Sequence, residues 1–535
     1  MSGFGVLNWT VLVAYVAATL GLGVLLSRRV HTADDFFLAG RTIPWWAIGI
    51  SVVATYVSAL SFLGGPAWSY REGFRVIAIH LNYPLVIFIV VTFFLPFFYN
   101  SGVPSIYAYL EERFGSASRT VMSSIFLITQ TLTTAAVLYA TALVIEFITG
   151  IDVQVAIILV TVLALGYTLL GGIAAVIWTD VIQAIVLLVG AVVIFVQLLG
   201  ALPGPVVEVL RSLNAEGRMQ ALDLSVSLER EATVWSGLLA MTLFHTTVYG
   251  ANQMMVQRTL AARSLEEAKK AYLMMGFAAF FIYFLFIVMG PLFFAYYDGR
   301  TFENGNTIIL EFANSLAIPG LLGLIAAAVV AASMSSLDSS LNSMATASAV
   351  DFYQRFFRPK ATSDQLLRVS RHFTVLWAVV IVYPALQFAQ SEGSVLQTLS
   401  KVGSYFVGAK LSMFALGFFS KHATEKGVLV GIAAGFVVIW AVALNTDIAW
   451  PWYCAVGASV NVLVALVASR ALDGAQSEWH RYTIRGQQQL QLQRENHDES
   501  RKRLPGSVDR VSWLLLVFLV ASVGALFLFD NWLEG

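Results

Sequence analysis

The sequence predicts an all-α polytopic membrane protein with about 14 transmembrane helices, and three observations support this fold class. Of the 535 residues, 58% are hydrophobic and only 12% are charged, whereas soluble domains carry roughly 25% charged residues. The apolar residues gather in segments of about 20 residues, the length that crosses the hydrocarbon core of a bilayer. Lys and Arg collect in alternate loops between these segments, as expected for a protein with many spans.

The expected spans follow one another with short loops, except for longer connections at 201–233 and 471–510. No basic segment or cleavage site accompanies the first apolar segment, so we expect a retained helix and not a cleaved signal. The spans are centred on residues 8–27, 44–66, 76–98, 120–147, 153–171, 178–200, 235–256, 272–296, 319–350, 373–390, 396–419, 427–446, 451–469 and 511–530. Tryptophans near the span ends are expected at the membrane interface, without a site role: Trp45, Trp46, Trp68, Trp450 and Trp452.

Loop charge predicts the orientation in the membrane. If the N-terminus lies outside, all the Lys and Arg clusters fall on the cytoplasmic side, and an even number of spans puts the C-terminus outside as well. We therefore expect a multi-pass protein of the plasma (inner) membrane, surrounded by the lipid bilayer, with both termini outside. The clusters lie in 28–41, 113–119, 258–270, 355–371, 421–426 and 470–503.

Composition and motifs argue against several classes of function. The net charge is zero, which gives no indication of a nucleic-acid partner. Cys454 is the only cysteine, so no disulfide can form within the chain. The sequence contains no P-loop, no G-x-S-x-G elbow and no H-E-x-x-H pair, so ATP-driven transport and hydrolysis are disfavoured. We expect a protein that is not an enzyme, and the oligomeric state stays open.

The most informative stretch is AASMSSLDSSLNS at 331–343, in the middle of an expected span. Its small and polar residues recur three and four positions apart, so they share one face of a helix. Asp338 stands beside them, and a carboxylate at membrane depth indicates a functional site. A helix-packing face is the alternative for the serines alone, whereas Asp338 favours an ion-handling site. The face consists of Ala332, Ser335, Ser336, Ser339, Asn342 and Ser343.

Three expected spans carry residues that interrupt a membrane helix, at 55–66, 245–252 and 400–410. Non-helical backbone at membrane depth persists only where it is buried in protein or lines a cavity. The first two interrupted spans lie five spans apart. If a five-helix unit begins at each of them, the two units have opposite orientations in the membrane, because five is an odd number. Inverted repeats of this kind occur in secondary transporters, whose ion and solute sites lie near the midplane. Simple kinks at glycine are the alternative.

Five motifs carry a family resemblance: DDFFLAGR (34–41), GGIAAVIWTDVIQ (171–183), NQMMVQRTLAARS (252–264), SSLDSSLNS (335–343) and GAKLSMFALGFF (408–419). With these motifs the chain resembles the sodium/solute symporter family, which includes the sodium-coupled galactose, proline, sialic acid and monocarboxylate carriers. The resemblance covers residues 8–530, nearly the whole chain. It implies a LeuT-type core of two inverted five-helix repeats, built from the second to the eleventh span.

The resemblance implies a sodium-coupled symporter that imports a small organic solute by alternating access. Two alternatives stay open: a proton-coupled or uncoupled carrier of the same fold, and a membrane sensor that binds a solute without moving it. The implied division is an N-terminal extra helix and cytoplasmic loop (1–43), a first repeat (44–200), an extracellular loop (201–233), a second repeat (234–420), accessory helices (421–470), a cytoplasmic polar linker (471–510) and a last helix (511–535).

The resemblance also implies a sodium site that the family shares. Its ligands would be the backbone carbonyls of Ala54, Val57 and Ala332 with the hydroxyls of Ser335 and Ser336. This set agrees with the physics of the segment, because an interrupted helix frees carbonyls and a neighbouring helix offers two adjacent hydroxyls.

Some family members have a second sodium site nearer to the cytoplasm, and the matching positions are Asp180, Ser335, Asp338 and Ser339. Asp338 stands where the family usually has a hydroxyl. Two carboxylates at one site would favour a cation strongly, so we expect two sodium ions per cycle. The alternative is that Asp180 or Asp338 is protonated, or paired with another residue such as Lys410.

The same matching implies a solute pocket near the midplane. Three specificities of relatives are not supported, because the galactose carriers' lysine matches Phe280, the sialic acid carriers' arginine matches Thr133, and the proline carrier's aspartate matches Tyr56. The remaining hydroxyls, histidines and aromatic rings suit a small carboxylate or a polyol-like metabolite, and helix packing is the alternative for each histidine. The lining would be Thr55, Ser58, Leu60, Ser61, His80, His245, Tyr249 and Gly403.

Overall fold

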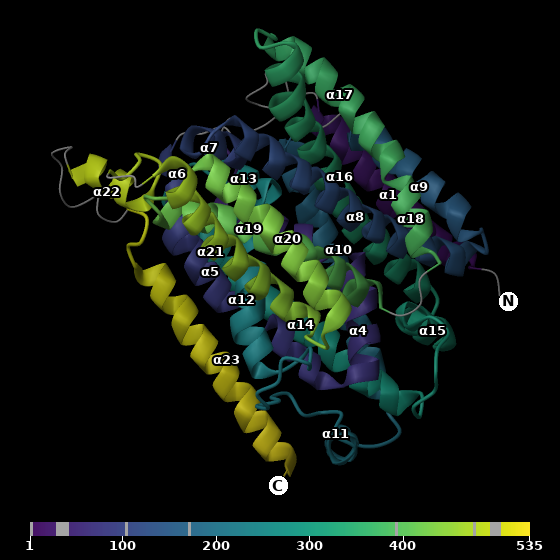
Figure 1. Cartoon of the computed structure of the whole chain (residues 1–535). Coiled ribbons are helices and arrows are strands. Elements are labelled where there is room, and N and C mark those ends of the chain that lie inside the picture. Colours follow the sequence, from purple (N-terminus) through teal and green to yellow (C-terminus); the bar gives the residue numbers. More distant parts are fainter. Residues whose placement is uncertain are drawn as a thin grey trace.

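The computed structural model describes residues 4–27, 42–101, 105–168, 173–390, 394–474, 478–492 and 504–534. Within these ranges the chain is helical, and one isolated β-bridge joins Ile43 to Ala262. The helices form one bundle, and α23 (Arg510–Glu534) runs along its side to the C-terminus (Figure 1). The prediction of an all-α protein is confirmed. The motif at 34–41 and residues 171–172 of the next motif lie outside the described residues.

The first half of the chain combines long helices with short segments that meet at breaks and turns. Four of these elements, from η2 to α6, form one continuous span at Phe74–Asn100. The bounds are α1 (Val6–Ser27), α3 (Trp45–Tyr56), α4 (Ala59–Glu72), η2 (Phe74–His80), α5 (Tyr83–Ile89), η3 (Val90–Phe94), α6 (Leu95–Ser101), α7 (Ile106–Arg113), α8 (Ser116–Thr149), α9 (Val153–Thr168), α10 (Ile173–Gly200), α11 (Val206–Ala215), η4 (Ser236–Ala240), α12 (Met241–Gly250) and α13 (Gln253–Leu260).

The second half contains longer uninterrupted helices. One of them, α16, continues into a π-helical segment, η6, so that the pair forms a span of 37 residues. The bounds are α14 (Leu265–Tyr296), η5 (Gly305–Thr307), α15 (Ile308–Ser315), α16 (Leu321–Ala347), η6 (Ser348–Phe357), α17 (Ser363–Val380), α18 (Val382–Phe388), α19 (Val395–Phe419), α20 (Glu425–Asn445), η7 (Trp450–Trp452), α21 (Tyr453–Asp473) and α22 (Ile484–Leu492).

Ten helical segments in the described part of the chain are long and apolar enough to cross a membrane, and the bent pair of α3 and α4 is an eleventh. The apolar stretches Val6–Thr19 of α1 and Val153–Gly166 of α9 are shorter. The span expected at 235–256 is divided among η4, α12 and α13. A multi-pass membrane protein is therefore confirmed, whereas the count of about 14 spans stays a prediction.

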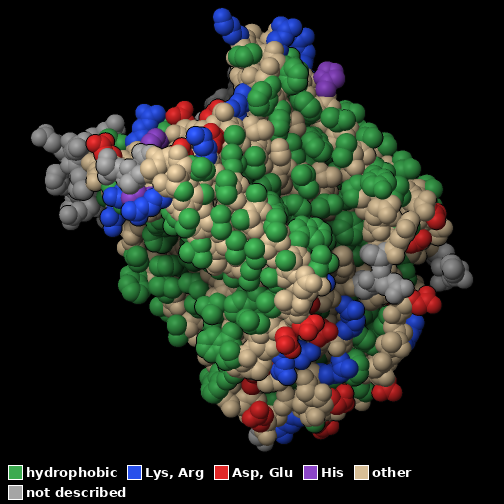
Figure 2. Space-filling view, in the orientation of Figure 1, with side chains coloured by type: hydrophobic (Ala, Val, Ile, Leu, Met, Phe, Trp, Pro, Cys, Tyr) green, Lys and Arg blue, Asp and Glu red, His purple; other side chains and the backbone are tan. Residues whose placement is uncertain are grey.

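Figure 2 shows a broad hydrophobic surface between two ends where charged side chains gather. Large apolar side chains are exposed on helices at the outside of the bundle: Val437 of α20 is 69% exposed, Val467 of α21 is 71% exposed and Val520 of α23 is 72% exposed. Such exposure is unfavourable in water, but in a bilayer these side chains contact lipid. The surface therefore agrees with a membrane environment.

Two helices are interrupted where the sequence predicts interruptions. Val57 and Ser58 separate α3 from α4, whose axes are bent by 53°. Ala251 and Asn252 separate α12 from α13, and the Asn252 side chain caps α13 by accepting the backbone N–H of Met254 at 3.0 Å. The interruptions are thus formed by extended residues and a helix cap, and not by glycine kinks.

The interruption predicted in the eleventh span is wrong, because α19 is one continuous α-helix from Val395 to Phe419. Its hydroxyls bond to their own helix, as Ser400 does by donating to the Leu396 carbonyl at 2.8 Å. Gly408 allows close packing, since a Cβ there would lie 3.0 Å from the backbone nitrogen of Ala458 in α21. Small and hydroxyl residues here indicate helix contact and back-bonding, neither of which breaks a helix.

We predict that Gly290→Ala destabilises the bundle. α14 and α4 cross at Gly290, where an added Cβ would contact the Ser69 hydroxyl and lie 2.5 Å from the Tyr70 nitrogen. The two backbones must then separate, at a cost of about 1–3 kcal/mol, which should lower the melting temperature of the purified protein in detergent. The matched control is Gly524→Ala in α23, where no atom lies within 4 Å of the new Cβ. Equal melting temperatures for the two variants would contradict the close crossing.

Candidate functional site

The break between α3 and α4 interrupts the backbone hydrogen bonds of the helix. The Val57 N–H donates to the Val53 carbonyl at 2.9 Å, and the bonds resume where the Ser61 N–H donates to the Ser58 carbonyl at 3.0 Å. The carbonyl of Ala54, which would accept from Ser58 in a continuous helix, lies between these two points. Because buried carbonyls need a partner, the break provides acceptors for a cation or for a donor from a neighbouring helix.

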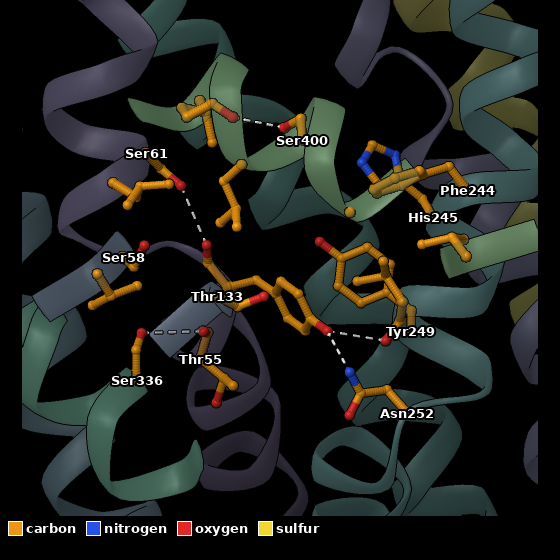
Figure 3. A pocket seen from close by; sticks show the side chains of 18 of the residues that line it. Thr55, Ser58, Ser61, Thr133, Phe244, His245, Tyr249, Asn252, Ser336 and Ser400 are labelled. Carbon is orange, nitrogen blue, oxygen red and sulfur yellow. Dashed lines mark hydrogen bonds between the residues drawn. The ribbon is translucent and has the colours of Figure 1, made fainter. Parts of the chain in front are cut away.

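α16 lies beside this break and provides a donor. Ser336 Oγ lies 3.3 Å from the Thr55 carbonyl and 3.2 Å from the carbonyl of Ala332 in its own helix. Figure 3 shows Ser336 facing Thr55 across this contact. The residues predicted for the shared sodium site therefore lie on the two elements that meet here. The Ser335 hydroxyl has a different partner from that of Ser336, because it donates to the Asp180 carboxylate.

Asp180 on α10 is fully buried and is surrounded by donors. Its carboxylate accepts from Ser51 of α3 at 2.5 Å and from Ser335 of α16. Arg258 of α13 lies 3.4 Å from this carboxylate, and it also donates to Ser51 Oγ at 3.0 Å and to Ser339 Oγ. Three of the four residues predicted for the second sodium site therefore meet, but they meet around a guanidinium that the prediction did not include.

The pairing partner of Asp180 is Arg258 and not Lys410. Lys410 donates to Thr129 Oγ1 of α8 at 2.8 Å. Asp338, the fourth predicted ligand, is buried in α16, with 3% of its surface exposed. Arg258 belongs to the motif at 252–264, so an arginine close to an interrupted span was the available signal in the sequence.

A cavity of about 190 Å³ lies beside the same break. Figure 3 shows side chains of several helices around it, among them Ser61 of α4, Thr133 of α8, His245 of α12 and Ser336 of α16. The structure brings together all the residues predicted for the solute pocket, and their role in binding stays a prediction. The predicted residues in the cavity wall are Thr55, Ser58, Leu60, Ser61, His80, His245, Tyr249 and Gly403.

His245 is held by a hydrogen bond on one side of its ring. Its Nδ1 lies 2.7 Å from Asn82 Oδ1. The Asn82 amide donates to the carbonyls of Ile79 and Gly237, so its oxygen is the acceptor and His245 Nδ1 carries the proton. Helix packing therefore accounts for the Nδ1 side of this histidine.

Two polar nitrogens in the cavity wall have no hydrogen-bond partner among the described residues: His80 Nε2 and Trp68 Nε1. The His80 ring is fixed by its Nδ1, 3.0 Å from the Tyr83 hydroxyl, and by stacking on Tyr283 with centroids 3.9 Å apart. The interfacial positions predicted for Trp68 and Trp450 are wrong, because the two side chains are 1% and 2% exposed and pack on each other. Buried unsatisfied nitrogens indicate positions where a ligand can form a hydrogen bond: it accepts one from Trp68 Nε1, and it accepts or donates one at His80 Nε2 according to the tautomer.

Of the three positions that match specificity residues of relatives, two line the cavity and one does not. Thr133 and Tyr56 line the cavity. Phe280 instead packs edge-on against Phe518 of α23, with centroids 5.7 Å apart. Further lining residues were not predicted, because their places depend on how distant helices meet: Trp68, Tyr83, Thr129, Gln130, Asn252, Tyr283, Ser340 and Lys410.

We predict that Arg258 and Asp180 depend on each other for stability. Removing one partner of a buried ion pair leaves an uncompensated charge and costs about 3–5 kcal/mol. Arg258→Gln and Asp180→Asn should each lower the melting temperature, and the double variant should lose clearly less than the sum of the two. The measurement is a double-mutant cycle in detergent, and strictly additive losses would contradict the ion pair.

Comparisons with known proteins identify relatives over most of the chain. The sequence model described as "Sodium:solute symporter family" matches residues 36–435. The sodium/sialic acid symporter NanT of Aliivibrio fischeri is 33% identical, over 87% of this chain and 93% of the relative. The sodium/glucose cotransporter of Vibrio parahaemolyticus is 30% identical, over 81% of this chain and 84% of the relative. The human sodium/iodide cotransporter is also 30% identical, over 82% and 69% respectively.

Solved structures agree with these matches. A sodium-coupled sialic acid symporter in a substrate-bound, outward-open state has a TM-score of 0.81 at 29% identity, covering 89% of this chain and 100% of that chain. Mhp1, a nucleobase-cation-symport-1 family transporter, has a TM-score of 0.56 at 14% identity, over 82% and 94% respectively, and so shares the fold. The resemblance carried by the motifs is confirmed. The chain belongs to the sodium:solute symporter family, whose members are sodium-coupled transporters and not enzymes.

Proposed function

We propose that this symporter holds sodium at the α3–α4 break and a small organic solute in the adjacent cavity, and carries both by alternating access. The observation that carries the proposal is the contact between Ser336 and the Thr55 carbonyl. Both residues also line the cavity, so an ion at the break and a solute in the cavity contact the same wall. Each ligand then favours the conformation that binds the other, which is the coupling that symport requires.

For the first ion we propose the carbonyls of Ala54, Val57 and Ala332 with the hydroxyls of Ser335 and Ser336. Carbonyl and hydroxyl oxygens are ligands that replace the hydration shell of a monovalent cation. Ser336 Oγ now donates hydrogen bonds to the carbonyls of Thr55 and Ala332, and the Ala332 carbonyl belongs to the proposed ligand set. All the ligands are neutral, so the ion can leave again in each cycle.

For the second ion we propose Asp180, Ser335, Asp338 and Ser339, which gives two sodium ions per cycle. Arg258 now supplies the positive charge at Asp180 and also binds Ser339. A sodium ion and the guanidinium therefore compete for the same carboxylate. Binding of the second ion requires the Arg258 side chain to move away from Asp180. Because Arg258 belongs to α13, binding of this ion is coupled to the conformation of α13.

The proposal takes 44–200 and 234–420 as two inverted five-helix repeats of a LeuT-type core, within about 14 spans. The similar breaks in α3–α4 and α12–α13 and the fold shared with Mhp1 support this division. Around the core we propose an extra helix and cytoplasmic loop at 1–43, an extracellular loop at 201–233, accessory helices at 421–470, a cytoplasmic linker at 471–510 and a last helix at 511–535, with both termini outside a plasma membrane.

The solute is proposed as a small carboxylate or a polyol-like metabolite. The names of the relatives give sialic acid, glucose and iodide as their cargo. The cavity of this chain combines serine and threonine hydroxyls, two histidines and a group of tyrosines. Such a wall can bind carboxylate or hydroxyl oxygens and pack against the carbon skeleton of a small molecule.

We predict a sodium-specific rise of the melting temperature that depends on Ser336. A ligand that binds only the folded state stabilises it by RT ln(1 + [L]/Kd), so the purified protein should melt higher in NaCl than in KCl at equal ionic strength. Ser336→Ala should weaken apparent sodium affinity about tenfold or more, because one ligand oxygen is lost. The matched control is Ser333→Ala in the same helix, whose hydroxyl bonds to Val329 and Thr141. An equal response in KCl would favour the proton-coupled alternative.

We predict that Asp180→Asn binds one sodium ion fewer than the unchanged protein. A neutral amide cannot balance the charge of a second ion, whereas the first site keeps all its neutral ligands. Equilibrium binding of radioactive sodium to the purified protein should saturate at two ions per chain, and at one ion in the variant. Two ions in Asp180→Asn would contradict the second site. Ser336→Ala should still saturate at two ions, but at a higher sodium concentration, and an unchanged binding curve in that variant would contradict the first site.

A further inference from the structure

α19 carries a lysine in the cavity wall that neither proposed sodium site uses. The ammonium of Lys410 donates to Thr129 Oγ1 of α8 at 2.8 Å and lies 6.0 Å from the centroid of the Phe126 ring. Among the described residues Lys410 forms no ion pair, whereas Arg258, the cation at the second sodium site, is paired with Asp180. At membrane depth, Asp180 thus neutralises the charge of Arg258, whereas no described acidic residue neutralises the charge of Lys410.

The cavity provides no negative charge for Lys410. The described residues that line it include no Asp and no Glu, and Lys410 is the one Lys or Arg among them. The polar residues around it are neutral: Thr129 Oγ1 accepts its hydrogen bond, and elsewhere in the same wall Gln130 Nε2 donates to Ser340 Oγ at 2.7 Å. An ammonium in the membrane interior is strongly unfavourable without a counter-charge, and polar partners alone compensate it only in part.

We propose that Lys410 binds the carboxylate of the transported solute, which makes the solute a small organic anion. This inference rests on the proposed function, because it takes the cavity as the solute site. The ammonium, which has three N–H donors and gives one of them to Thr129, would donate charge-assisted hydrogen bonds to the carboxylate. The Ser61 hydroxyl and the free His80 nitrogen, both in the same wall, then contact other polar groups of the molecule.

Charge balance during transport supports an anionic solute. Ser336 of the proposed sodium site lines the same cavity as Lys410, so ion and solute bind close together. A neutral solute would leave a sodium ion and an ammonium near each other in a region of low dielectric constant, where like charges repel strongly. A carboxylate attracts both cations, and its binding should therefore raise the affinity for sodium.

The test is a melting-temperature series on the full-length protein in detergent at saturating NaCl. The probes are lactate and N-acetylneuraminate, each compared with its methyl ester, together with glucose as a neutral polyol and NaI as an inorganic anion. At least one carboxylate should raise the melting temperature, and its ester and glucose should not. In Lys410→Met the apparent affinity for that carboxylate should fall at least about tenfold, as expected for a lost charge-assisted bond, and Lys410→Arg should recover part of it.

The matched control is Lys401→Met, which removes the same charge from an exposed position of the same helix. It should leave the carboxylate response unchanged, and both methionine variants should keep the sodium response that reports a folded protein. Stabilisation by glucose or by the esters alone would overturn the anionic solute and leave the solute cavity intact. An iodide response equal to that of the carboxylates would overturn carboxylate recognition. If no organic probe acts although sodium does, the cavity assignment itself fails together with this inference.

Discussion

The interruption of one helix at Val57 and Ser58 is the constraint on which the candidate site depends. Backbone carbonyls at membrane depth cannot turn to water, so a broken helix must be enclosed by protein and supplied with partners. α16 meets this requirement with Ser336, whose hydroxyl reaches the Thr55 carbonyl. The cavity lies against the same break because the non-helical residues prevent closer packing there. The proposed ion ligands and the proposed solute contacts therefore adjoin for one structural reason.

Features with a strong local signal could be predicted from the sequence. Apolar segment length identifies the membrane helices, and hydroxyls followed by Gly64, Gly65 and Pro66 indicated the broken span. The face of α16 could be predicted as well, because its spacing is strictly helical and Asp338 has no reason to stand in a lipid-facing position. The same reasoning failed for α19, where Ser400 bonds to its own helix and Gly408 packs against α21. Residue type alone does not distinguish a break from a close helix contact.

Interactions between distant segments could not be predicted. Arg258 is separated from Asp180 by 78 positions, and Lys410 from Thr129 by 281 positions. Nothing in either local sequence indicates which acid or hydroxyl a cation at membrane depth meets. Trp68 shows the same limit, since a tryptophan near a span end is usually interfacial, and only the packing of Trp450 explains its burial. The pocket residues were predicted through family resemblance, which carries information on tertiary contacts that periodicity lacks.

α16 and η6 are attached to α8 along their length. Thr141 of α8 bonds to Ser333, and Gln130 bonds to Ser340. Farther along, Arg119 of α8 binds the buried carboxylate of Asp351 in η6 at 2.7 Å, and Ser123 binds it at 2.9 Å. Among the described residues these bonds join α8 to α16 and η6 at three levels. α16 contacts α3 directly through Ser336, and it is joined to Ser51 of α3 through Asp180 and Arg258. The α16 residues that we propose as ion ligands are therefore held against α8, and we expect a change of conformation at the site to move α3 and α4 against this pair.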